Sequence, residues 1–131
     1  SQAAFAKGEL VSEELALTLL RKLISQTDSL NQDFIFDGVA RTIGEAQEME
    51  KIFTLQRVFH LKVNFETARA RLIKRGRKGD RPALIKRRFN IYGREIGPVL
   101  SFYRGAGVLV EIDASRSSPE EIVEELASKL P

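Results

Sequence analysis

Three short apolar runs, separated by segments of helical type, constrain the fold of this 131-residue chain more than any other feature. They cover residues 34–36, 58–63 and 108–112, and each has the length of a β-strand. Strands that alternate with helices favour a parallel sheet with helices on both faces, because parallel neighbours need a crossover connection. We therefore predict an α/β fold. Ligands of such folds bind at the carboxyl ends of strands, where Asp37 and Asp113 follow the first and third runs.

The segments between these runs begin with residues that cap helices, namely Ser12, Thr42, Asn64 and Ser118. Helices are expected over about residues 12–25, 43–53, 65–74, 81–104 and 118–130, with a kink or a division of the fourth at residues 97–98. The residues expected to face inward from the first and last helices are Leu15, Leu19, Leu20, Leu23, Ile24, Ile122, Val123, Leu126 and Leu130.

The composition is that of one ordinary globular domain over residues 1–131, with 43% hydrophobic and 30% charged residues. The absence of cysteine excludes disulfides and cysteine-ligated zinc, and it fits a reducing cytoplasm. No apolar run approaches the roughly 20 residues that a membrane span needs. We therefore expect a cytoplasmic protein without a membrane partner.

The net charge of +3 is unevenly distributed along the chain. Residues 69–94 hold eleven of the 21 lysines and arginines and a single acid, Asp80. Such a block attracts phosphate groups. A solvated basic helix face would produce the same composition, and a nucleic-acid backbone would match the same charge.

One candidate site follows the first apolar run. Arg41 lies four residues beyond Asp37 and precedes a helix whose first N–H groups carry the positive end of the helix dipole. A guanidinium beside these donors can hold an oxyanion. The alternative is that Arg41 pairs with Asp37, or with another carboxylate, only to hold the loop.

A second candidate site lies within the basic block, at Arg75, Arg77, Asp80, Arg81, Arg87 and Arg88. Several guanidinium groups that converge on one loop with one acid repel one another unless an anion lies among them. Phosphoryl transfer needs this arrangement, because its catalysis consists mostly of positioning and charge neutralisation.

The residues of both sites resemble those of the adenylate kinase family. DGVARTIGEAQ at 37–47 resembles the family signature DG-F-P-R-T-x-x-Q-A, and RLIKRGRKGDRPALIKRRFNIY at 71–92 resembles its lid arginines, R-x-D-D turn and R-L-x-x-Y helix. KGELVSEEL at 7–15 is similar to G-x-L-V-x-D-E-L, and VEIDASRSSPEEIVEEL at 110–126 resembles the family's closing strand, turn and helix. The resemblance runs in unbroken order over residues 7–130.

The resemblance implies a role for each matching residue. Asp37 would organise magnesium-bound water, Gly38 would approach the base of the monophosphate, and Arg41 would hold the acceptor phosphate. Arg75 would lie against the adenine of ATP, with the backbone around Arg116 at its edge. Arg77 and Arg88 would bind the phosphoryl group in transit, and Asp80 would orient those arginines. The monophosphate pocket would be lined by Gly8, Leu10 and Val11.

Three positions depart from the family pattern. Ala40 replaces a cis-proline, and because a non-proline cis bond costs roughly 2.5–4 kcal/mol we expect a trans peptide and an altered loop. Glu45 replaces the glutamine that reads the adenine of AMP, and it could instead complete a capping box with Thr42. Gly79 replaces one aspartate of the usual pair, and residues 75–81 leave room for a short basic loop in place of a lid domain.

The 131 residues contain no G-x-x-x-x-G-K-[ST] phosphate loop. By analogy, the strand that precedes this loop would lie between the strands at 34–36 and 58–63. We therefore expect the chain to be part of a longer protein and to give no kinase turnover from these residues by themselves.

The leading hypothesis is a nucleoside monophosphate kinase of adenylate kinase type, a monomer that transfers a phosphoryl group from Mg-ATP to AMP. A kinase specific for another monophosphate is the alternative that Glu45 raises. A catalytically inactive binding or structural module with the same fold is a second alternative, favoured by the missing phosphate loop, Ala40 and Gly79. A nucleic-acid binder that uses residues 69–94 is a third, and we consider it the least favoured.

Overall fold

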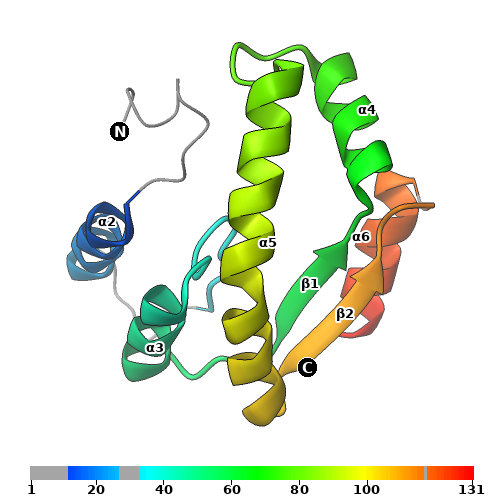
Figure 1. The fold of residues 1–131 in the computed structure, drawn as a ribbon. Coiled ribbons are helices and arrows are strands. Elements are labelled where there is room, and N and C mark those ends of the chain that lie inside the picture. The colour runs from blue at the N-terminus through cyan, green and yellow to red at the C-terminus, as the bar shows by residue number, and fades with distance from the viewer. Residues whose placement is uncertain (1–11, 27–32, 117) are drawn as a thin grey trace.

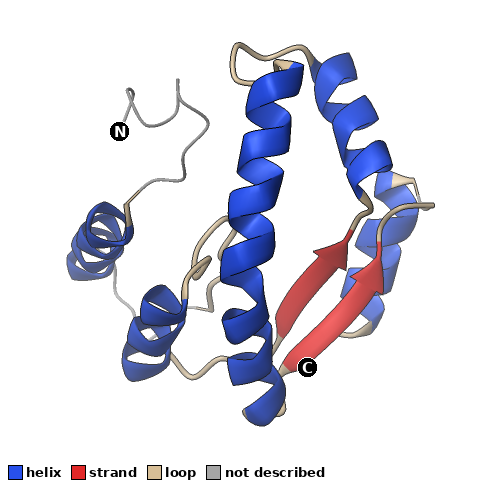
Figure 2. Cartoon of the chain, viewed as in Figure 1, coloured by secondary structure: helices blue, strands red, loops and turns tan. Residues whose placement is uncertain are grey.

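The computed structural model describes residues 12–26, 33–116 and 118–131 (Figure 1). In chain order the elements are α2 (Glu13–Ser25), α3 (Ile43–Ile52), β1 (Val58–Lys62), α4 (Phe65–Arg75), α5 (Pro82–Gly105), β2 (Leu109–Asp113) and α6 (Pro119–Ser128) (Figure 2). None of the described helices combines the length and the apolar character that a membrane crossing requires.

The sheet consists of β1 and β2, which pair in parallel from Val58 opposite Leu109 to Lys62 opposite Asp113. The connection between them runs through α4 and α5, so the crossover is helical as predicted. α5 lies on one side of the two strands and α6 on the other (Figure 1). The predicted α/β fold with a parallel sheet and helices on both faces is confirmed.

The capping residues begin helices at the expected positions. The side-chain oxygens of Ser12, Thr42, Asn64 and Ser118 accept hydrogen bonds from the backbone N–H groups of Leu15, Glu45, Thr67 and Glu121. α5 begins with Pro82 in its first turn and continues without a division past Pro98 to Gly105. The expected division at residues 97–98 therefore does not occur.

The strand predicted at residues 34–36 is wrong. These residues are irregular, and Ile35 is 91% exposed, whereas the rings of Phe34 and Phe36 pack against Phe53. A strand needs a neighbour whose backbone completes its hydrogen bonds, and the two described strands pair only with each other. The apolar run is therefore a loop segment that buries alternate side chains.

The predicted inward faces of the terminal helices are partly wrong. Leu20 is buried on α2, but Leu19 and Leu23 are 56% and 49% exposed. Val123 is 62% exposed on α6, and Leu130 beyond its end is 52% exposed. Helical periodicity identifies an apolar stripe, but the width of the stripe that becomes covered depends on the neighbouring elements.

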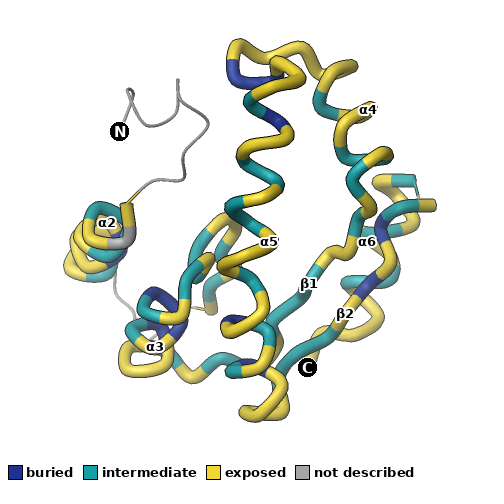
Figure 3. Tube along the Cα trace, in the orientation of Figure 1, coloured by how far each residue is buried: buried dark blue, intermediate teal, exposed yellow. Residues whose placement is uncertain are grey.

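The best-packed part of the core lies at the amino ends of the strands. Ala46 of α3 and Val99 and Tyr103 of α5 are buried together, with Val58 and Leu109 packed against them (Figure 3). A second contact joins β1 to α5, because Nε2 of His60 lies 2.7 Å from the hydroxyl of Tyr92. Burial lowers the pKa of His60. This packing fixes α5, whose opposite end carries the candidate site.

Gly76 ends α4 with φ of 68°, a left-handed conformation that costs a residue with a Cβ roughly 1–2 kcal/mol. We expect Gly76→Ala to lower the free energy of unfolding by about 1 kcal/mol. Gly105→Ala is the matched control, because Gly105 lies at the helical end of α5 with nothing within 4 Å of an added Cβ, and it should be neutral or stabilising. Urea unfolding measures both, and equal effects of the two substitutions would contradict the role of the left-handed cap.

Candidate functional site

The loop between α4 and α5 is a tight turn built around Asp80. Gly76 redirects the chain at the end of α4, and the backbone N–H of Asp80 donates to the carbonyl of Arg77 at 2.8 Å. Gly79 and Asp80 are both buried although they lie at the tip of the helical pair (Figure 3). The turn therefore places the carboxylate of Asp80 beneath the basic side chains.

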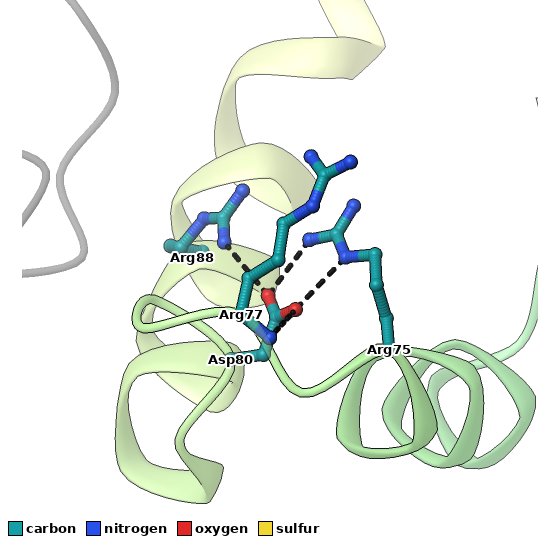
Figure 4. A network of polar contacts seen from close by, with 4 residues as sticks. All are labelled: Arg75, Arg77, Asp80 and Arg88. Atoms are coloured by element: carbon teal, nitrogen blue, oxygen red, sulfur yellow. Dashed lines mark hydrogen bonds and ion pairs between the residues drawn. The ribbon is translucent and has the colours of Figure 1, made fainter.

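Asp80 binds three arginines. Nε and Nη2 of Arg75 each donate to one carboxylate oxygen at 2.8 Å, which is a bidentate pair. The backbone N–H of Arg77 donates to Oδ2 at 3.1 Å, and Nη1 of Arg88 lies 3.8 Å from Oδ1 (Figure 4). The side chain of Asp80 is only 1% exposed. The hydrogen bond from Arg75 is the main cause that holds the pKa of Asp80 below its ordinary value, with further lowering by Arg77 and Arg88.

This cluster carries more positive than negative charge. Figure 4 shows the side chains of Arg75, Arg77 and Arg88 around a single carboxylate. Within the described part of the chain, the guanidinium of Arg77 has no ion-pair partner. The hydrogen bond that Asp80 accepts from Arg77 comes from the backbone N–H of Arg77. Asp80 pairs with Arg75 and Arg88, and the guanidinium of Arg77 beside them has no ion-pair partner among the described residues, so this side chain favours a bound anion.

A second group of predicted residues lies at the start of α3. Nε of Arg41 donates to the carbonyl of Gly38 at 2.9 Å, and Asp37 is exposed. The described contacts of Arg41 include no bond to Asp37, so the expected alternative of an Asp37–Arg41 pair does not hold. Ala40 has φ of 59°, and the described chain has no cis peptide, which confirms the expected trans bond.

The carboxylate of Glu45 is hydrogen-bonded to the backbone just before α3. Its side chain accepts a hydrogen bond from the backbone N–H of Arg41 at 2.7 Å, while its own N–H donates to the hydroxyl of Thr42 at 3.2 Å. The residue is 4% exposed. The carboxylate therefore stabilises the start of α3 and the backbone of Arg41, in the manner of a capping box shifted by one residue.

The remaining predicted residues are less connected. Arg116 is exposed in the turn after β2, and Gly8, Leu10 and Val11 lie outside the described residues. No described hydrogen bond or ion pair joins the group at Asp37–Arg41 to the cluster at Asp80. The described residues also contain no group of three histidine or acidic side chains that could hold a metal ion.

Sequence reasoning missed Arg71 of α4. Its two terminal nitrogens donate to the carbonyls of Ala114 at 2.7 Å and Ser115 at 3.2 Å, just before Arg116. The N–H of Ser115 also donates to Asp113 at 2.9 Å. Arg71 therefore fixes the turn at the carboxyl end of β2, and no local pattern could have indicated a contact between residues this far apart in sequence.

The structure is that of an α/β protein with a parallel sheet and with arginines gathered around one carboxylate at the loop between α4 and α5. The sequence matches the profile of the family described as Adenylate kinase over residues 1–108. The chain belongs to the adenylate kinase family, whose members are nucleoside monophosphate kinases and therefore phosphotransferases.

Individual relatives agree with this assignment. The chain is 31% identical to the adenylate kinase of Synechococcus sp. (strain WH7803), an alignment that covers 99% of this chain and 72% of the relative. It is 33% identical to the adenylate kinase of Cyanothece sp., and this alignment covers 88% of the chain and 63% of the relative. It is 31% identical to adenylate kinase isoenzyme 1 of Gallus gallus, and this alignment covers 98% of the chain and 69% of the relative. The chain thus spans roughly two thirds of the length of these relatives.

Proposed function

We propose that the protein takes part in phosphoryl transfer from Mg-ATP to AMP, and that the cluster around Asp80 receives the phosphates. The observation that carries this proposal is the buried carboxylate of Asp80, which binds Arg75 through two hydrogen bonds of 2.8 Å and lies 3.8 Å from Arg88. Such a carboxylate orients the arginines before the nucleotide binds. Preorganised charge of this kind is the main contribution that a protein makes to phosphoryl transfer.

Each arginine of the cluster has a proposed role. Arg77 and Arg88 bind the phosphoryl group in transit, since the guanidinium of Arg77 has no ion-pair partner among the described residues and Nη1 of Arg88 lies beside Asp80 at 3.8 Å. Arg75 presents its guanidinium plane to the adenine of ATP while its edge is held by Asp80. The backbone around Arg116 lies at the edge of that base. Asp80 is a positioning residue that acts through the arginines.

The start of α3 is the proposed acceptor side. Arg41 binds the phosphate of AMP, and the N-terminus of α3 adds the positive end of its dipole. Gly38 lies near the base of the monophosphate, with Gly8, Leu10 and Val11 lining its pocket. Magnesium would neutralise charge on the ATP phosphates, and Asp37 would hold one of its water molecules.

Residues 75–81 take the place of a lid domain in this proposal. The loop is stiffened by the bonds to Asp80, so it approaches ATP as one unit together with the ends of α4 and α5. The proposed setting is a cytoplasmic monomer that acts on small nucleotides. Glu45 leaves open a monophosphate other than AMP, because its carboxylate accepts hydrogen bonds and cannot donate them when ionised.

Arg41→Ala tests the acceptor side. We expect it to weaken binding of a bisubstrate analogue, two adenosines joined by a polyphosphate, by about tenfold or more, the value of one charge-assisted hydrogen bond of 1.5–3 kcal/mol. Isothermal titration calorimetry measures the Kd. Arg21→Ala is the matched control, because Arg21 pairs with Glu48 at the surface of α2. Equal binding by the original chain and Arg41→Ala, or no binding by either, would contradict the proposed site.

A further inference from the structure

A groove lies between α4 and α5, away from the side chains of the Asp80 cluster. It has a volume of about 1120 Å³ and is open to solvent. The two helices diverge from the loop that joins them (Figure 1), and residues of both form the walls. A Cβ added at Gly93 would meet nothing within 4 Å, so the wall at that point is unobstructed.

The rim of the groove is basic. Arg69, Lys86, Arg87 and Arg94 line it together with Asn90, and no acidic residue lines it. Arg69, Lys86 and Arg94 are exposed and have no ion pair with any residue in the described ranges. Three cations that face one groove without a carboxylate create a positive potential that favours an anionic partner.

The floor of the groove is aromatic and apolar. Phe65 of α4 and Phe89 of α5 line it, with ring centroids 5.0 Å apart and the rings edge to face. Both side chains are half-buried, so part of each ring faces the groove. Pro82, Ala83 and Ile91 complete the apolar lining.

The groove is separate from the proposed phosphoryl site. Successive residues of a helix are rotated by about 100°, so Lys86 and Asn90 point about 160° away from Arg88 around α5. Arg75, Arg77, Asp80 and Arg88 do not line the groove. Nucleotides bound at the Asp80 cluster therefore leave these cations uncompensated.

The combination of cations with aromatic rings favours single-stranded nucleic acid over an acidic peptide. An acidic peptide would satisfy the charges, but it offers little that uses two aromatic rings. The bases of a single strand stack on aromatic side chains, while its backbone follows a basic groove. The cations that line this groove come from both helices, and Lys86 and Arg94 lie about two turns apart on α5, a spacing that suits a polymer better than a single phosphate.

We propose that the groove between α4 and α5 binds single-stranded nucleic acid without sequence preference. Arg69, Lys86 and Arg94 contact backbone phosphates, and Phe65 and Phe89 contact the bases. Because three cations displace counterions from the strand, log K should fall with log salt concentration with a slope of about −2. This activity is independent of phosphoryl transfer.

Fluorescence anisotropy with a labelled ten-nucleotide oligothymidine tests the proposal at several salt concentrations. We expect a Kd of about 1–100 μM at physiological salt and the slope given above. The double variant Lys86→Ala and Arg94→Ala should weaken binding at least tenfold and reduce the slope to about −0.7. The control Lys22→Ala and Lys51→Ala removes the same charge outside the groove and should leave the Kd within twofold.

Two competitors separate this groove from other sites. A saturating bisubstrate analogue should not displace the oligonucleotide, whereas displacement would place the strand at the Asp80 cluster and overturn the proposal. Polyglutamate of matched charge should compete at least tenfold less well. Equal competition, absence of binding, or equal loss in both double variants would each overturn the assignment to single-stranded nucleic acid at this groove.

Discussion

Replacing Arg88 with alanine is expected to weaken binding of the bisubstrate analogue by about 30-fold or more, because truncating one member of a charged contact costs roughly 2–5 kcal/mol. The fold should persist, since Asp80 keeps both hydrogen bonds from Arg75 and the backbone bond from Arg77. Calorimetric titration measures the Kd, and circular dichroism on heating measures the stability.

The control for this substitution lies on the same helix. Arg104 at the far end of α5 pairs with Glu111 at 3.0 Å, and its side chain is 61% exposed. Arg104→Ala removes the same charge and side chain but should leave the Kd within twofold, because surface ion pairs contribute little. Equal losses in Arg88→Ala and Arg104→Ala would show that binding depends on overall charge and not on the cluster.

Asp80→Asn is expected to weaken binding of the same analogue by about 10- to 100-fold, the range for partners that orient a binding group. This result is opposite to that expected from charge alone, because the substitution makes the cluster more positive. Asparagine keeps the shape of Asp80, but its amide NH₂ takes the place of one carboxylate oxygen, so one of the two bonds that Arg75 now donates is lost. The three guanidinium groups would then repel one another and lose their orientation. Tighter binding by the variant would contradict the positioning role.

The stability effect of Asp80→Asn should depend on pH. The bond from Arg75 lowers the pKa of Asp80 in the folded protein below the ordinary value of 3.8. A carboxylate with a lowered pKa stabilises the fold above its ordinary pKa, and this contribution is lost as the pH falls through the folded value. Urea unfolding should therefore show a constant difference between the original chain and the variant from about pH 5 to 8. The difference should shrink below pH 3.8, and a difference that grows in acid would contradict this role.

Local signals were sufficient for most of the fold. Ser12, Thr42, Asn64 and Ser118 cap helices as expected because their bonds reach only three residues along the chain. The parallel pairing of β1 and β2 followed from the helices between them. The strand predicted at residues 34–36 is absent, because a strand depends on a neighbouring strand that the apolar run itself does not specify.

The candidate site was predictable to the extent that its contacts are local. Arg75, Arg77 and Asp80 lie within six residues, so the turn brings them together once α4 ends at Gly76. The long-range contact from Arg71 to the turn after β2 had no such signal. The sequence left open whether Arg41 pairs with Asp37, because the left-handed conformation of Ala40 and the bond from Arg41 to the carbonyl of Gly38 have no signal in the local sequence pattern.

The most direct test of the phosphate site is a nuclear magnetic resonance titration of the nitrogen-15-labelled chain with the bisubstrate analogue. We expect the side-chain Nε–H signals of Arg77 and Arg88, the backbone signal of Asp80 and the signals of Arg41 to shift together with one Kd. Arg75 should keep its protected Nε–H because its bond to Asp80 persists. Shifts confined to Arg69, Lys86 and Arg94, or no shifts at saturating analogue, would show that the Asp80 cluster does not bind the phosphates.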